Sequence, residues 1–191
     1  MDNPAVRVWA RPRLERLSDR RQAHSWAVAC LAAAWAPRCG VDPADAFGAG
    51  LVHDLAREWP GSALVAEAER LHWPADEAER ASPILLHGPV AAAWMARDLV
   101  GTPSMQAAVR YHTSAAPSLD PLGQLLFVAD ALEPGRRYPG VEALRAVAAA
   151  SVAGGYRAVL DATLRYLAAR GLEPHPRTQA AWRDACGGRD G

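Results

Sequence analysis

The stretch GLVHDLAREWP, residues 50–60, joins an apolar helical segment to an adjacent histidine and aspartate, His53 and Asp54. Asp42 followed by Pro43 is typical of a helix cap and first turn, so we predict a helix from 43 to about 57. Neighbouring residues on a helix point about 100° apart, so this pair cannot share one face as residues four apart do. The pair suits a helix end, where both side chains can converge on one point.

Four more polar residues lie in or at the end of other apolar helical segments: His24, His87, His112 and Asp130. An unpartnered imidazole or carboxylate would cost a few kcal/mol to bury in such a position. The six residues together therefore predict a metal site, built where helices pack against one another. Imidazole and carboxylate suit iron, manganese or zinc, and a site without thiolates has no special claim on copper or a metal cluster.

Composition narrows the chemistry. The 191 residues include 21 basic and 21 acidic ones, and every basic residue is an arginine. The cancelling charge gives no reason to expect nucleic acid or an anionic membrane as a partner. Since lysine is absent from the sequence, Schiff-base chemistry and a lysine general base are excluded, whereas arginine remains available for phosphate.

The cysteines and the apolar runs indicate the cellular compartment in which we expect the protein. Cys30, Cys39 and Cys186 are odd in number and have no CxxC spacing, which argues against a disulfide framework and a zinc knuckle and favours a reduced cytoplasm. We find neither a secretory signal nor an apolar run long enough to span a bilayer. We therefore expect a soluble, cytoplasmic protein.

Alanine and leucine dominate the periodic stretches, and no alternating run of β-branched residues is long enough for a strand, so we predict an all-α, single-domain bundle of about eight to ten helices. The Gly154-Gly155 pair either breaks or only kinks the stretch that contains it. We expect an N-terminal extension over 1–17, a helical domain over 18–186 and a flexible tail over 187–191. The predicted helices cover about 19–37 with a stop at Gly40, 43–57, 62–72, 89–100, 103–112, a segment that starts at 121 and carries Asp130, 141–153, 156–170 and 176–185.

The order His, His-Asp, Asp resembles the signature of the HD-domain metal-dependent phosphohydrolases. Longer strings are similar to the YqeK-type branch of that family, the symmetrical bis(5'-nucleosyl)-tetraphosphatases, over roughly residues 20–182. The resemblance implies an HD-type helical fold. The matching strings are GLVHDLARE (50–58), LLHGPVAA (85–92), RYHTSAAPSL (110–119), FVADALEPGRRYPGVEALR (127–145) and EPHPRTQAA (173–181).

The resemblance further implies hydrolysis of diadenosine tetraphosphate and its relatives to two nucleoside diphosphates, with iron as the usual metal and manganese or zinc as alternatives. The expected mechanism is in-line attack of a metal-bound hydroxide on an inner phosphorus, with Asp54 or Asp130 as ligand and proton acceptor. His87 and His112 either complete a second metal position or contact substrate phosphates, and we favour phosphate contact. Carried over residue by residue, the metal ligands are His24, His53, Asp54 and Asp130.

Residues beside the motifs are candidates for substrate contact. Arg57 lies one helical turn after the His-Asp pair and can hold a phosphate beside the metal, although the resembled family usually has lysine there. Thr113 and Arg136 adjoin motif residues and can share this role. His175 and Thr178 lie at a predicted helix start, whose free N–H groups favour a phosphate; capping alone would also explain His175.

Two residues outside the motifs have different expected roles, one in the site and one at the surface. Among the arginines of residues 7–21, only Arg21, three residues before the first motif histidine, is a candidate for the site, because the others suit a solvated face. His72, at the end of a predicted helix, is expected at the surface.

Two other functions stay open. The same site could act on another nucleotide, such as a mono- or triphosphate or a guanosine alarmone. The scaffold could also serve as a non-catalytic nucleotide or metal sensor, although such sensors usually lack ligands and none is missing here. As partners we expect a small-molecule nucleotide, allow for a homodimer, and expect neither nucleic acid nor a membrane.

Overall fold

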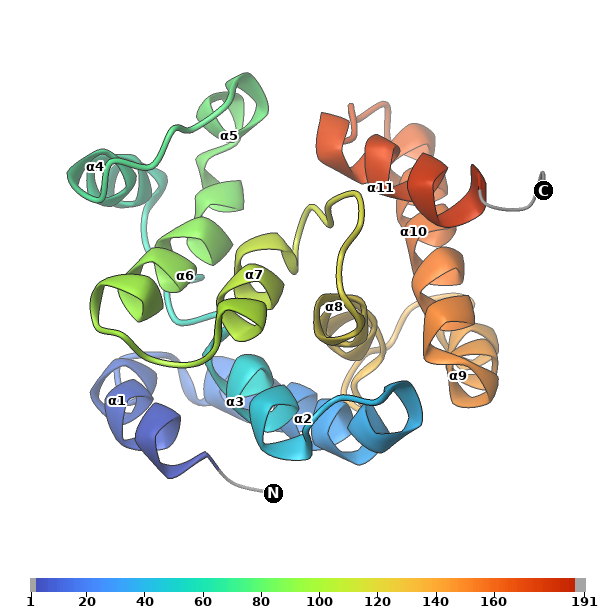
Figure 1. Ribbon diagram of the computed structural model, residues 1–191. Helices are drawn as coiled ribbons and strands as arrows, with labels where there is room; N and C mark the ends of the chain where they lie inside the picture. The colour runs from blue at the N-terminus through green and yellow to red at the C-terminus, as the bar shows by residue number, and fades with distance from the viewer. Residues whose placement is uncertain (1–2, 188–191) are drawn as a thin grey trace.

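The computed structural model describes residues 3–187, and over this range the chain forms helices and contains no strand (Figure 1). The all-α prediction is thus confirmed. The predicted tail beyond Gly187 lies outside the described residues. The α-helices are α1 (Pro4–Leu14), α2 (Asp19–Trp35), α3 (Pro43–Val52), α4 (Gly61–Arg70), α5 (Glu77–Ala81), α6 (His87–Arg97), α7 (Pro103–Tyr111), α8 (Pro121–Leu132), α9 (Val141–Ala150), α10 (Val152–Ala169) and α11 (Pro176–Gly187), with 3-10 helices η1 (Ala36–Cys39) and η2 (Pro83–Leu86).

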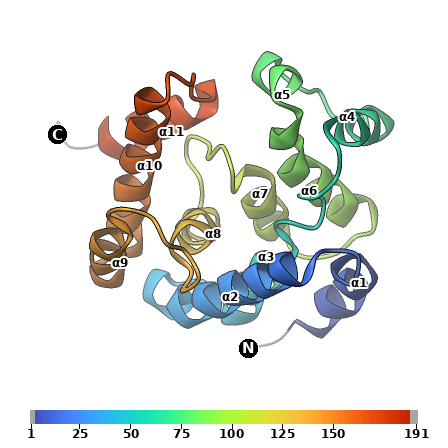
Figure 2. The same cartoon turned by 180° about the vertical axis from the view of Figure 1, so that it is seen from behind.

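Helix α8 lies in the middle of the bundle, with α7 on one side and α10 and α11 on the other, as both views show (Figures 1 and 2). Leu122 and Leu125 of α8 join the apolar core formed with α1 to α4, α6 and α7. Phe127 and Val128 of the same helix join a second apolar group formed with α9 to α11. Helix α8 is therefore the wall shared by both groups, and Asp130 lies near its C-terminal end.

Helix α3 begins as predicted and ends earlier than predicted. The Asp42 carboxylate accepts hydrogen bonds from the backbone N–H groups of Ala44 and Asp45, which caps the first turn. The helix ends at Val52 rather than near residue 57. The Nδ1–H of His53 donates to the carbonyl of Gly50 at 2.7 Å. This carbonyl therefore bonds a side chain instead of the next backbone N–H of the helix. The His-Asp pair therefore occupies the first two residues after the helix.

Two glycines beside motif histidines allow helices to approach closely. A Cβ atom on Gly50 would lie 2.6 Å from the backbone Cα of Ala29, so α3 can contact α2 at this distance only without a side chain. A Cβ atom on Gly88 would lie 2.9 Å from the carbonyl oxygen of Val109 and 3.1 Å from the ring of His112. These contacts bring together the segments that carry His24, His53, His87 and His112.

Three local features differ from the prediction. Helix α1 occupies most of the predicted N-terminal extension and buries Val6 and Ala10 against the core. The short helix α5 was not predicted, although Asp76 and Glu79 form a capping box at its start. The break in the last third of the chain lies at Ser151, whose hydroxyl caps the N–H of Gly154, so the glycine pair falls inside the first turn of α10.

Cys30, Cys39 and Cys186 are all free. Within residues 3–187, none of the helices combines the length and apolarity that crossing a membrane requires.

Candidate metal centre

The fold brings all six motif residues to one place. They come from α2 (His24), the turn after α3 (His53 and Asp54), the start of α6 (His87), the residue after α7 (His112) and α8 (Asp130). His53 is completely buried, and Asp54, His87 and His112 are also buried. Five segments far apart in the sequence therefore supply one buried cluster of imidazoles and carboxylates.

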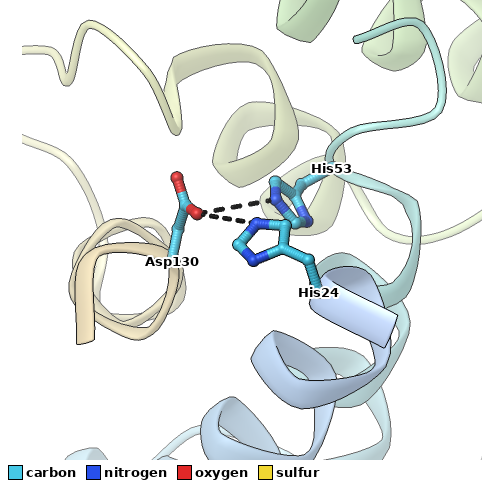
Figure 3. A group of neighbouring side chains, drawn as sticks. All are labelled: His24, His53 and Asp130. Carbon is cyan, nitrogen blue, oxygen red and sulfur yellow. Dashed lines mark ion pairs between the residues drawn. The ribbon is translucent and has the colours of Figure 1, made fainter. Parts of the chain in front are cut away.

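Four of these side chains face a common point. The Nε2 atom of His24 lies 3.0 Å from Oδ1 of Asp130, and Nε2 of His53 lies 3.8 Å from the same oxygen (Figure 3). Oδ2 of Asp54 lies 3.6 Å from Nε2 of His24 and 3.4 Å from Nε2 of His53. Both Nε2 atoms are buried and make no hydrogen bond. Two orphaned ring nitrogens beside two carboxylate oxygens fit a divalent metal ion, which such ligands hold well.

A second group shares Asp54 with the first. Oδ1 of Asp54 lies 3.2 Å from Nε2 of His87 and 3.7 Å from Nε2 of His112. The two Nε2 atoms are 2.9 Å apart, and the hydroxyl of Thr113 lies 3.0 Å from Nε2 of His112. Nitrogens at this distance need a shared proton or another cation between them, since two lone pairs repel each other. Asp54 thus links both groups through its two oxygens.

Hydrogen bonds on the far side of three rings fix which nitrogen faces the centre. The Nδ1–H groups of His53, His87 and His112 donate to carbonyls three residues earlier, those of Gly50 (2.7 Å), Ile84 (2.5 Å) and Val109 (2.7 Å). All three histidines directly follow a helix, and each ring turns back to a carbonyl of the last turn of that helix. The backbone therefore sets the tautomer that presents Nε2 to the centre.

Charges inside the cluster shift its pKa values. Burial alone would raise the pKa of Asp54, but the charge of His53 and the contacts of the carboxylate with the rings of His112, His53 and His87 lower this pKa far below the usual range. Burial disfavours the charged form of His53, yet the negative charge of Asp54, whose carboxylate lies beside Nε2, raises the pKa of His53 to about 9. Burial lowers the pKa of His87. The carboxylate thus stays ionised, and His53 holds a proton that a metal ion must displace.

A cavity of about 200 Å³ opens onto this cluster. Arg21 forms an ion pair with Oδ2 of Asp54 at 2.6 Å, and Arg136 bonds the carboxylate and the backbone carbonyl of Asp130. Arg57 also lines the cavity. The lining of the cavity therefore contains two ion pairs, Arg21 with Asp54 and Arg136 with Asp130. The lining residues are Arg21, Asp54, Arg57, Ile84, His87, His112, Thr113, Asp130 and Arg136.

Two predicted substrate residues lie outside this lining. His175 is buried, with Nε2 at 3.1 Å from a carboxylate oxygen of Asp76, and its Nδ1 accepts the N–H of Arg177. The hydroxyl of Thr178 donates to the carbonyl of Ser114 at 2.6 Å. Both residues thus connect α11 to neighbouring segments, and their contact with substrate stays a prediction. His72 is exposed, as expected.

Sequence reasoning missed one residue of the cluster, Glu133. Its buried carboxylate lies 3.3 Å from Nδ1 of His24. The signal was available in principle: a histidine inside a helix needs an acceptor from elsewhere, because the neighbouring carbonyls are already bonded. Which acidic residue supplies that acceptor could not be read from the spacing. Arg21, considered only for its position before His24, does reach the site.

Comparisons with known proteins place the chain in a family. A family model described as HD domain matches residues 21–135. The chain is 33% identical to the symmetrical bis(5'-nucleosyl)-tetraphosphatase of Bacillus subtilis over 70% of its length and 72% of the relative's. It is 30% identical to the enzyme of the same name from Staphylococcus aureus, over 70% and 69%.

A solved structure shares the whole fold. It is a predicted HD superfamily hydrolase involved in NAD metabolism from Clostridium acetobutylicum, with a TM-score of 0.87, 25% identity and 96% of each chain covered. The relatives, the shared fold and the buried His/Asp cluster agree with the resemblance of the motifs. The chain belongs to the HD domain family and is an HD-domain phosphohydrolase related to the symmetrical bis(5'-nucleosyl)-tetraphosphatases.

Proposed function

We propose that this protein hydrolyses dinucleoside tetraphosphates symmetrically, converting diadenosine tetraphosphate and one water into two molecules of ADP, with iron as the resident metal. The observation that carries the proposal is the His/Asp cluster at the base of an arginine-lined cavity, in a chain whose relatives bear the name of this activity. Manganese and zinc fit the same ligand types, so iron rests on the family resemblance.

Four residues would hold the metal: His24, His53, Asp54 and Asp130. A bound divalent ion would supply a water of lowered pKa as nucleophile and positive charge beside the phosphate. Asp54 and Asp130 are ionised, since their pKa values lie well below the usual range despite burial. Both carboxylates are therefore available as negatively charged metal ligands, and their lowered pKa values make them weak proton acceptors until the charges around them change.

The cavity suits the phosphate chain better than the nucleosides. At about 200 Å³ it is smaller than the roughly 300–1,000 Å³ of sites that enclose a drug-sized ligand. The reacting phosphates would enter it while the nucleosides lie outside. Among the described residues, no ion pair or side-chain hydrogen bond engages Arg57, whereas Arg21 and Arg136 are each paired with a carboxylate. Arg57 is thus the guanidinium most available for a phosphate oxygen.

The second group, His87, His112 and Thr113, lies on the other side of Asp54. A cation or proton between the two ring nitrogens would give this group a positive charge facing the cavity. We propose phosphate contact here, and a second metal ion is the alternative. Another nucleotide substrate remains the competing function, because the solved relative is described as involved in NAD metabolism. A dinucleotide with a shorter phosphate chain is therefore the substrate to compare.

Product analysis tests the proposal. Protein purified without oxygen is assayed for metal content and then incubated with diadenosine tetraphosphate or NAD in water enriched in ¹⁸O, with iron, manganese or zinc added in separate samples. We expect ADP as the sole nucleotide product from the tetraphosphate, with one of every two ADP molecules carrying the heavy oxygen on its terminal phosphate. Release of AMP with ATP, faster turnover of NAD, or no turnover with any metal would refute the assignment. Asp54→Ala protein prepared in parallel controls for contaminating hydrolases.

A further inference from the structure

His24 differs from the other three histidines of the centre in its place on the helix. It lies within α2, where neighbouring carbonyls accept the hydrogen bonds of the helix itself. The other three rings use carbonyls at helix ends. His24 therefore needs an acceptor from another segment to fix its tautomer and orientation.

Glu133 supplies that acceptor. It follows the last residue of α8, is buried, and places Oε1 at 3.3 Å from Nδ1 of His24. Its other carboxylate oxygen accepts the backbone N–H of Gly135. A Cβ atom on Gly135 would lie 2.9 Å from this carboxylate, so the turn is shaped around it. Both oxygens of Glu133 thus have defined partners.

The backbone of this turn is held from a further helix. Arg145 of α9 donates to the carbonyl of Leu132 at 3.0 Å and to the carbonyl of Glu133 at 2.7 Å. Its guanidinium also reaches the carbonyl of Arg136 at 3.2 Å. The position of Glu133 is consequently fixed by the hydrogen bonds of its carboxylate and by those that Arg145 donates to the main chain around it.

We propose that Glu133 is a positioning residue of the metal centre: it holds His24 as the Nδ1–H tautomer and aims Nε2 at the metal, without being a ligand itself. Glu133 contacts the nitrogen on the opposite side of the ring from the one that faces Asp54 and Asp130. Hydrogen-bond partners of this kind typically change metal affinity by about 10- to 100-fold. The inference rests on the metal centre of the proposed function and is independent of its substrate.

The test is a titration of the metal-free protein with Co²⁺, which reports affinity and, through its visible absorption, the ligand geometry. Glu133→Ala should bind Co²⁺ about 10- to 100-fold more weakly than the unmodified protein, with an altered absorption spectrum. The matched control is Glu67→Ala, because Glu67 also accepts from a ring N–H, that of Trp94, but lies on α4 away from the centre. Its Co²⁺ affinity should be unchanged.

Two conservative variants distinguish the effect of side-chain length from that of the negative charge. They also test the inference if Glu133→Ala does not fold. Glu133→Gln keeps the length and an acceptor oxygen, whereas Glu133→Asp keeps the charge and withdraws the carboxylate by one methylene. We expect both variants to bind Co²⁺ more weakly than the unmodified protein, because Gln offers one acceptor oxygen for the two donors and Asp withdraws the carboxylate from His24. Folded variants that all retain the original affinity and spectrum would overturn the inference alone. If the unmodified protein binds no divalent ion, the metal centre of the proposed function fails with it.

Discussion

The close contact of α2 with α3 at Gly50 predicts a specific response to Gly50→Ala. The added Cβ would lie 2.6 Å from Cα and 2.8 Å from the backbone nitrogen of Ala29. Ordinary carbon contacts are about 3.5–4.0 Å, so the helices would have to separate by roughly 1 Å. A backbone atom cannot rotate out of the way as a side chain can. The displaced segments carry His24, within α2, and His53, directly after α3.

The magnitude follows from two opposing terms. Replacing glycine by alanine inside a helix stabilises it by about 1 kcal/mol. Overpacking costs about 1–3 kcal/mol. Gly48→Ala gains the same helical term in the same helix, but the one close contact of its Cβ, at 2.7 Å, would be with the terminal methyl of Met105, a flexible side chain that can move, and its contacts with Val6 at 3.5 and 3.7 Å are of ordinary length. Gly50→Ala should therefore be about 1–3 kcal/mol less stable than Gly48→Ala, because the helical terms cancel.

Urea unfolding in the presence of a chelator measures this difference without a contribution from bound metal. The seven tryptophans provide a fluorescence signal. Metal affinity should also fall in Gly50→Ala and stay near that of the unmodified protein in Gly48→Ala, since only the former moves the two histidines apart. Equal free energies of unfolding for the two variants would refute the argument that backbone contact at Gly50 sets the distance between these helices.

Three further outcomes are expected. Asp54→Ala should abolish turnover and weaken metal binding, because the two oxygens of Asp54 face both histidine groups, whereas His72→Ala should leave turnover nearly unchanged. Equal losses in a steady-state assay would contradict the assignment of these residues. Arg57→Ala should raise KM for the tetraphosphate with metal content unaltered, and a fall in metal content instead would place Arg57 among the groups that support the metal. In metal-free protein the pKa of His53, at about 9, lies above the usual value of about 6.5, so its proton contributes stability below pH 6.5 that is lost as the pH rises to about 9. Over the same interval metal affinity should increase, because a smaller fraction of His53 carries a proton that the metal must displace. The melting temperature with chelator and a Co²⁺ titration, each at several pH values, measure these two opposite trends. If neither quantity changes with pH, His53 is not the group that titrates.

Local signals in the sequence predicted most helix starts correctly. Asp42, Thr102 and Asp120 each precede a proline, and each caps its helix through a side-chain oxygen in the structure. The same kind of signal was present but overlooked at Asp76 and Ser151. At Ser151 the cap outweighs the glycine pair that follows, because a satisfied N–H group defines a helix start more strongly than two flexible residues define a break.

Helix α1 was missed for a different reason. Its arginines and prolines give a weak helical pattern, and only Val6 and Ala10 are buried. Trp9 and Arg13 of this helix hydrogen-bond to the carboxylate of Asp98, which lies directly after α6. A contact between residues so far apart in the chain leaves no periodic signal, so tertiary packing rather than local propensity stabilises this helix.

Capping signals and periodicity act over a few residues, so they were enough to predict that the chain is helical and that the His53-Asp54 pair lies at a helix end. The distances within the site depend on the packing of the helices. That packing alone placed the two oxygens of Asp54 between two histidine groups, set Gly50 against Ala29, and brought Glu133 to Nδ1 of His24 across 109 positions of sequence. Such contacts depend on distances between packed helices, and these distances are fixed by the whole bundle rather than by any segment of it.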